Sequence, residues 1–167
     1  FKKAIVNHKK AEHRAAYEGT IVFLATAYFY DKKYEKSKEY IDKAVLITSR
    51  RKDVSFYDTT SRAVQMLLQS TIGKCKEREV DLLAKEIMDS ASEKENNREC
   101  FYISQIYLIL KKQKKADKFQ KLCKKGLLKT AEKISDPKNR LDYMSTSLHK
   151  HMLKDVASSY ISINDKI

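Results

Sequence analysis

The chain is poor in the residues that interrupt regular structure. Its 167 residues include three glycines and one proline, and tryptophan is missing. Glycine and proline mark most turns and chain breaks, and no stretch shows the sustained apolar–polar alternation that a strand needs. No apolar run approaches the roughly 18 residues required to cross a membrane. The sequence therefore favours long helices and gives no sign of a membrane partner.

Cysteine is scarce as well. Cys75, Cys100 and Cys123 are odd in number, lie far apart and lack Cys-x-x-Cys spacing, so neither a disulfide framework nor a zinc site is indicated. We expect reduced, partly buried thiols, as in cytoplasmic proteins. No secretory signal is visible, which agrees with a cytoplasmic location.

Motifs of known catalytic chemistry are also missing. The sequence has no Gly-x-Ser-x-Gly elbow, phosphate-binding loop or His-Glu-x-x-His pair. His149 and His151 lie two residues apart, so on a helix they point about 200° away from each other and do not share a metal ion. We expect no enzymatic activity, no metal site and no cofactor in this chain.

What the sequence does contain is a repeated pattern. Residues 1–6 and 41–46 both read bulky apolar, polar, Lys, Ala and two aliphatic residues. A pattern that returns after 40 residues is typical of solenoids built from helical hairpins. The first copy starts in mid-pattern and without methionine. We therefore expect residues 1–17 to be the end of a truncated repeat.

The clearest copy spans residues 18–52. Its first helix has apolar residues at i, i+3, i+4 and i+7, a polar turn follows at 31–33, and small residues recur on the second helix. This pattern resembles the tetratricopeptide (TPR) repeat. Seven TPR marks are occupied in order by Ile21, Leu24, Ala25, Tyr28, Ser37, Ile41 and Ala44.

The other copies are more degenerate. Residues 96–135 repeat the pattern, with Tyr107 at the place of Tyr28 and a turn at 111–113, and a weaker unit covers 53–95. Beyond Pro137, which disfavours helix in the residue before it, a closing helix is expected over 138–163. The prediction is one all-α domain over 1–167, a TPR-like superhelical solenoid of about seven or eight helices, with Tyr28 and Tyr107 as equivalent core residues.

A binding groove follows from that architecture. In a TPR superhelix the first helix of each pair lines the inner groove, and residues off its packing stripe face the ligand. Nine residues are candidates for this groove: Thr26, Phe29, Tyr30, Arg62, Gln65, Gln69, Arg98, Phe101 and Gln105. Amide side chains suit the N–H and C=O groups of an extended peptide, and arginines suit a carboxylate. The alternative is that Gln and Arg are simply good helix formers on an exposed face.

Residues 27–44, followed by Arg51-Lys52-Asp53 and a new helix, resemble the peptide-sensing TPR domains of regulators from Firmicutes. These are the Rap phosphatases and the PlcR, NprR, PrgX and Rgg transcription factors, and the likeness covers about residues 1–130. It implies the sensor half of a cytoplasmic quorum-sensing regulator, either a transcription factor or a response-regulator phosphatase, which binds a short signalling peptide. In that family an N-terminal domain, which this sequence does not include, carries the output.

Charge leaves two alternatives open. The net charge is +13, and residues 111–125 hold eight lysines with Asp117 as the single acid. Such a block binds nucleic-acid phosphate, acidic protein or anionic lipid, or it is the solvated face of a helix. A general TPR protein–protein adaptor and, less favoured, a basic helical-repeat nucleic-acid binder therefore compete with the peptide sensor. A homodimer formed through the C-terminal region is a further partner to test.

Overall fold

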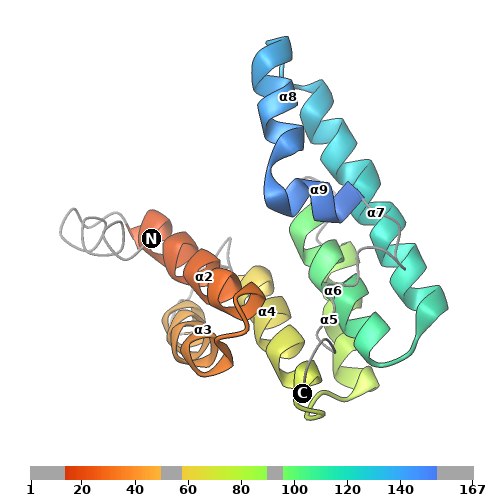
Figure 1. Cartoon of the computed structure of the whole chain (residues 1–167). Helices are drawn as coiled ribbons and strands as arrows, with labels where there is room; N and C mark the ends of the chain where they lie inside the picture. Colours follow the sequence, from red (N-terminus) through yellow and green to blue (C-terminus); the bar gives the residue numbers. More distant parts are fainter. Residues whose placement is uncertain (1–13, 50–57, 90–95, 154–167) are drawn as a thin grey trace. The chain divides into compact units, whose positions relative to one another are not determined.

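The computed structural model describes residues 14–49, 58–89 and 96–153 (Figure 1). Eight α-helices, α2 to α9, make up its regular structure, and these ranges contain no strand. The all-α class predicted from the sequence is therefore confirmed. Of the truncated repeat expected at 1–17, residues 1–13 lie outside the described residues, and the rest belong to α2.

The chain divides between Lys74 and Cys75 into two compact units, an N-terminal and a C-terminal one. The N-terminal unit contains α2 (Arg14–Tyr30), α3 (Tyr34–Ser49) and α4 (Asp58–Thr71). The C-terminal unit contains α5 (Glu77–Asp89), α6 (Asn97–Ile109), α7 (Gln113–Glu132), α8 (Pro137–Ser145) and α9 (Ser147–Leu153). The two helices of the repeat expected at 53–95, α4 and α5, thus belong to different units.

In the N-terminal unit α2 and α3 form a hairpin, and α4 packs against both helices. The hairpin buries Ile21 and Ala25 of α2 against a face of α3 that carries Ile41 and Ala44, all four with no exposed surface. Small side chains let the two backbones approach, and the Ser37 hydroxyl of α3 donates a hydrogen bond to the Ala25 carbonyl over 2.9 Å. The small positions predicted from the TPR pattern are therefore the positions of close helix contact.

A Schellman motif ends α2 and sets up the turn into α3. The Lys33 N–H donates to the Tyr28 carbonyl over 2.9 Å, and the Lys32 N–H donates to the Phe29 carbonyl over 3.0 Å. Lys32 takes a φ of 57°, the left-handed conformation that this motif requires after the last helical residue and that glycine usually supplies. The polar turn predicted at 31–33 is confirmed.

The same motif ends α6. The Lys112 N–H donates to the Tyr107 carbonyl over 2.8 Å, the Lys111 N–H donates to the Leu108 carbonyl over 2.9 Å, and φ of Lys111 is also 57°. A third motif ends α4, with Gly73 at a φ of 68°. Two hairpins, α2–α3 and α6–α7, therefore share one turn geometry.

In the C-terminal unit α6 is the central helix. It packs against α5 and α7, while α8 and α9 pack on α7 and on each other. Every residue from Glu99 to Tyr107 is buried, so α6 has no solvent-facing stripe over two turns. A helix buried all round belongs to the interior of its fold.

The closing helix expected over 138–163 is divided in the structure. Asp136 caps α8 by accepting a hydrogen bond from the Asn139 N–H over 2.7 Å, and Pro137 takes the first helical position. The chain then breaks at Thr146, which is extended with ψ at 147°, and the Thr146 hydroxyl accepts from the His149 N–H as α9 begins. A Ser-Thr-Ser sequence supplies this break, because its hydroxyls compete for backbone hydrogen bonds. Residues 154–163 lie outside the described residues.

Candidate functional site

Two of the groove candidates on α2 belong to the core of the N-terminal unit. Thr26 is 7% exposed and its hydroxyl donates to the Val22 carbonyl, while Phe29 is 4% exposed and packs its ring 5.7 Å from that of Tyr34. Tyr30 is half-buried, with its ring edge-on to Phe29. Of these three, Tyr30 keeps the largest exposed surface for a ligand.

The three candidates on α4 share one face, because they are spaced at i, i+3 and i+7. All three are half-buried. Arg62 pairs with Asp58 one turn earlier over 3.0 Å. Gln65 donates from Nε2 to Asp42 Oδ1 of α3 over 3.3 Å. The structure therefore brings Arg62, Gln65 and Gln69 together as one polar face.

The candidates on α6 also share one face but are more deeply placed. Arg98 is half-buried, Phe101 has no exposed surface, and Gln105 is 6% exposed. The Gln105 Nε2 is buried and has no hydrogen-bond partner among the described residues. Phe101 is a core side chain, whereas Gln105 is a buried amide with an unused donor.

The prediction that Tyr28 and Tyr107 are equivalent core residues is wrong, because only Tyr107 is buried. Tyr107 is 1% exposed, but Tyr28 is half-buried and stacks on Tyr40 at 5.6 Å with the Lys36 ammonium over its ring. The backbone positions of the two tyrosines do correspond, because both accept the long hydrogen bond of a Schellman motif. In α2 the neighbouring Phe29, at 4% exposed, is more deeply buried than Tyr28.

A buried glutamine that the sequence analysis passed over joins three helices. Gln120 of α7 is 2% exposed, accepts from the Ser104 hydroxyl of α6 over 3.1 Å, and donates to the Met152 carbonyl of α9 over 2.6 Å. Its position four residues after Ala116 and three before Cys123 puts it on the buried stripe of α7. That periodicity could have placed it, although not its partners.

A charged network joins α5 to the start of α7. The Lys115 Nζ lies 2.8 Å from Glu77 Oε1 and 2.7 Å from Asp81 Oδ1, and the Lys112 Nζ lies 2.7 Å from Glu77 Oε2. The Tyr107 hydroxyl donates to Asp81 Oδ1 over 2.6 Å, and Lys115 also lies over the Tyr107 ring. Two lysines of the basic block therefore form ion pairs within the C-terminal unit, between α5 and the start of α7.

This network holds the pKa values of its carboxyl groups low. Hydrogen bonds from Lys112 and Lys115 lower the pKa of Glu77 from its ordinary 4.5, and hydrogen bonds from Lys115 and Tyr107 lower the pKa of Asp81 from 3.8. Burial, and then the Asp81 hydrogen bond, raises the pKa of Tyr107. A depressed carboxyl pKa stabilises the fold above the unfolded-state value, and that stabilisation is lost as pH falls through the folded-state value.

We therefore expect Lys115→Met to lower the melting temperature at neutral pH and to lose this effect in acid. The difference between wild type and variant should be constant above about pH 5 and shrink toward about pH 3, as the carboxyls become protonated. Thermal unfolding followed by circular dichroism measures it. Lys38→Met, which breaks the exposed Lys38–Asp42 pair of α3, is the matched control and should have a smaller effect at neutral pH. A Lys115→Met difference that stays the same at all pH values would contradict the assignment.

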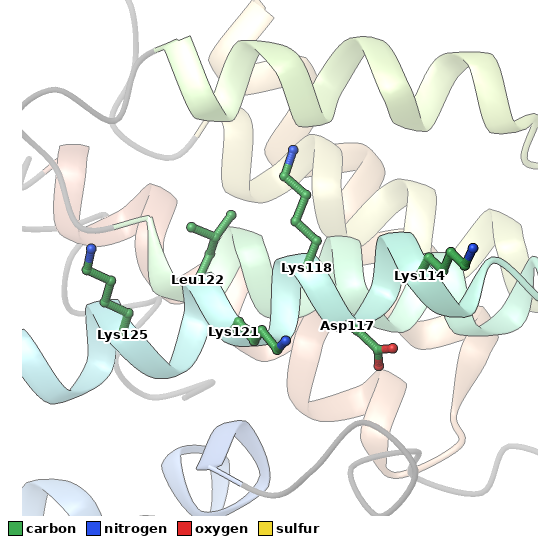
Figure 2. A pocket seen from close by; sticks show the side chains of 6 residues that line it. All are labelled: Lys114, Asp117, Lys118, Lys121, Leu122 and Lys125. Atoms are coloured by element: carbon green, nitrogen blue, oxygen red, sulfur yellow. The ribbon is translucent and has the colours of Figure 1, made fainter.

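Four other lysines of the block lie on the opposite, solvent-facing side of α7. Figure 2 shows them projecting from successive turns together with Asp117 and Leu122, around a shallow depression of about 550 Å³. The four are Lys114, Lys118, Lys121 and Lys125, and all are exposed. Within the block, the structure thus separates two lysines that form internal ion pairs from four that face solvent.

The thiols have no reactive environment. Cys75, Cys100 and Cys123 are free and buried, and burial raises the pKa of all three, that of Cys100 to about 12. A thiol that stays protonated is a weak nucleophile and metal ligand. Within the described ranges no three His, Cys, Asp or Glu side chains come together as a metal site.

Nor do the described helices include one that is both long and apolar enough to span a bilayer. Comparison of the chain with protein-family models, with curated proteins and with solved structures gives no match. The function therefore has to be argued from the chain's own residues.

Proposed function

We propose that this chain is a peptide-binding, TPR-like sensor domain without catalytic activity of its own. Two features support the proposal. The α2–α3 and α6–α7 hairpins carry small residues and a shared turn where TPR hairpins carry theirs, and α4 presents a half-buried face of one guanidinium and two amide side chains. Helical hairpins with such faces suit an extended segment whose main-chain groups require partners.

The observation that carries the proposal is the unused donor of Gln105. A buried N–H without an acceptor destabilises a fold by about 1–3 kcal/mol, and such groups are rare enough that each one needs an explanation. Gln120, the other buried amide among the described residues of this unit, has partners on both its oxygen and its nitrogen. Gln105 is therefore an amide with an unused donor. Because its Nε2 is buried, the proposal requires that peptide binding exposes this face of α6 to a peptide carbonyl.

The family resemblance extends the proposal. If the chain is the sensor half of a cytoplasmic quorum-sensing regulator, the ligand is a short signalling peptide, and the output domain is encoded beside the sensor. A general TPR adaptor would hold a segment of another protein with the same residues. Either ligand would be bound through amide side chains such as that of Gln69 in the N-terminal unit or that of Gln105 in the C-terminal unit.

We expect Gln69→Ala and Gln105→Ala each to weaken peptide binding by about tenfold or more, which corresponds to the loss of one paired hydrogen bond of about 1.4 kcal/mol. The probe is a heptapeptide selected from a random display library against the full chain and titrated by calorimetry. The melting temperature of Gln69→Ala should change little, because that half-buried amide has no internal partner among the described residues. Gln105 is buried, so Gln105→Ala also opens a cavity, and circular dichroism confirms that this variant is folded before its affinity is compared.

Gln113→Ala is the control for this experiment. Gln113 is exposed and bonds to Asp117 on the outer side of α7, so its removal should leave the affinity for the heptapeptide unchanged. Unchanged binding in both Gln69→Ala and Gln105→Ala, or a library that yields no binding peptide, would count against the sensor function.

A further inference from the structure

The solvent-facing side of α7 carries a lysine stripe that the peptide site does not explain. Lys114, Lys118, Lys121 and Lys125 recur at i, i+4, i+7 and i+11, which places them on one face of the helix. The buried residues of α7 lie on the opposite face: Ala116, Phe119, Gln120, Cys123, Leu127 and Ala131. The stripe therefore points away from the core that α7 forms with α6 and α9.

These four lysines have no ion-pair partner in the described part of the chain. By contrast, Lys112 and Lys115 at the start of the same helix are neutralised by Glu77 and Asp81. The uneven charge of residues 111–125 is thus concentrated on one outer face. Asp117 is the single acid on that face, and it bonds to Gln113.

This arrangement opposes helix stability. Like charges three or four residues apart destabilise a helix by about 0.2–0.5 kcal/mol per pair, and the stripe contains three such neighbouring pairs in sequence. A helix N-terminus favours acidic side chains, and α3, α4, α5 and α6 each have at least one in the first turn, whereas α7 has none. An anionic partner would relieve both effects.

We propose that the lysine stripe of α7 binds the phosphate backbone of duplex nucleic acid without reading its sequence. Neighbouring lysines are separated by about 4.5–6 Å along the helix axis, so the stripe is a straight row of point charges on flexible stems. A duplex offers a dense row of phosphates, which the stripe would contact with release of counterions. This role is separate from the peptide function proposed above.

The composition of the stripe argues for phosphate contacts alone. It has no aromatic side chain on which the bases of a single strand could stack, and no arginine for bidentate contacts to guanine. A membrane is a poorer partner, because an interfacial helix inserts its apolar face and the apolar face of α7 is buried in the unit. Leu122 is the single apolar side chain at the depression and is half-buried.

Fluorescence anisotropy of a labelled 20-base-pair DNA duplex of arbitrary sequence, titrated with the full chain, tests the proposal. Four lysine–phosphate contacts predict a slope of about −3.6 in log affinity against log salt, or about a 10²-fold loss between 50 and 200 mM salt. The quadruple variant K114Q/K118Q/K121Q/K125Q should bind at least tenfold more weakly at 50 mM and have a slope close to zero. All four side chains are exposed, and circular dichroism confirms that the variant is folded.

The matched control removes the same charge elsewhere. Lys43, Lys74, Lys76 and Lys85 are exposed and lie outside α7, so K43Q/K74Q/K76Q/K85Q should keep a slope near that of the wild type. Equal losses in the two quadruple variants would show that net charge alone matters and would overturn the proposal. Tighter binding to polyglutamate, or to phosphatidylserine vesicles, than to the duplex at the same salt would overturn it as well.

Discussion

Replacing Tyr107 by alanine is expected to lower the free energy of unfolding by about 3–5 kcal/mol, the range for a buried aromatic side chain. Its ring is 1% exposed and lies 5.7 Å from that of Phe119, so truncation opens a cavity between α6 and α7. Truncation also removes the hydroxyl that donates to Asp81. The lost stability therefore has two sources, the packing of the ring and the hydrogen bond from its hydroxyl to Asp81 of α5.

Tyr28→Ala is the matched comparison, because Tyr28 has the corresponding place in the other hairpin. Its half-buried ring should contribute about 1 kcal/mol. Urea unfolding of the full chain, followed by circular dichroism, measures both values. Tyr107→Phe, which keeps the ring and loses only the hydroxyl, should fall near 1 kcal/mol and separates the two contributions. Similar losses for Tyr28→Ala and Tyr107→Ala would mean that the burial difference between the hairpins is not real.

The second large effect is expected at Gln120. Replacing it by leucine should lower the free energy of unfolding by about 1–3 kcal/mol, because the Met152 carbonyl is then buried without a donor. That carbonyl lies in the last turn of α9, where a helix leaves its carbonyls unpaired. The Ser104 hydroxyl can still donate to the Phe101 carbonyl at 2.7 Å. The lost stability should therefore come mainly from the contact that attaches α9 to α7.

Gln105→Leu is the control for the Gln120→Leu measurement. The same substitution at a buried amide whose nitrogen has no partner should leave the free energy of unfolding unchanged or raise it, because an unsatisfied donor is removed. Both variants are compared by urea unfolding under identical conditions. A loss at Gln105 as large as at Gln120 would show that Gln105 has a structural partner, and the case for it as a ligand residue would fail.

The α2–α3 hairpin was predictable because its determinants are local. Ile21, Leu24, Ala25, Ile41 and Ala44 follow the helical period and are all buried, and the turn at 31–33 lies where three consecutive polar residues interrupt the stripe. The α6–α7 turn followed from the same reasoning. Helix period and turn residues act over less than ten positions, so the sequence displays them directly.

The groove candidates were less predictable, because the TPR marks identify only one packing stripe. Phe29 and Phe101 lie off that stripe, which made them candidates for ligand contact, yet both are buried. The helices bury more than one face, and no helical period reveals how many neighbours a helix has. Contacts between residues distant in sequence are equally unpredictable from local patterns. The residues around Lys115 do not indicate that it pairs with Glu77 and Asp81, and those around Gln120 do not indicate that it bonds to Met152.

The short turns of the two hairpins also bear on how the chain folds. Three residues connect α2 to α3, and three connect α6 to α7, so each hairpin closes a very small loop and loses little chain entropy in doing so. Folds dominated by such near-neighbour contacts form rapidly. We therefore expect each hairpin to act as a folding nucleus. We expect the hydrogen bond from Gln120 to Met152, which spans 32 residues, to form later, when α9 docks onto the α6–α7 hairpin.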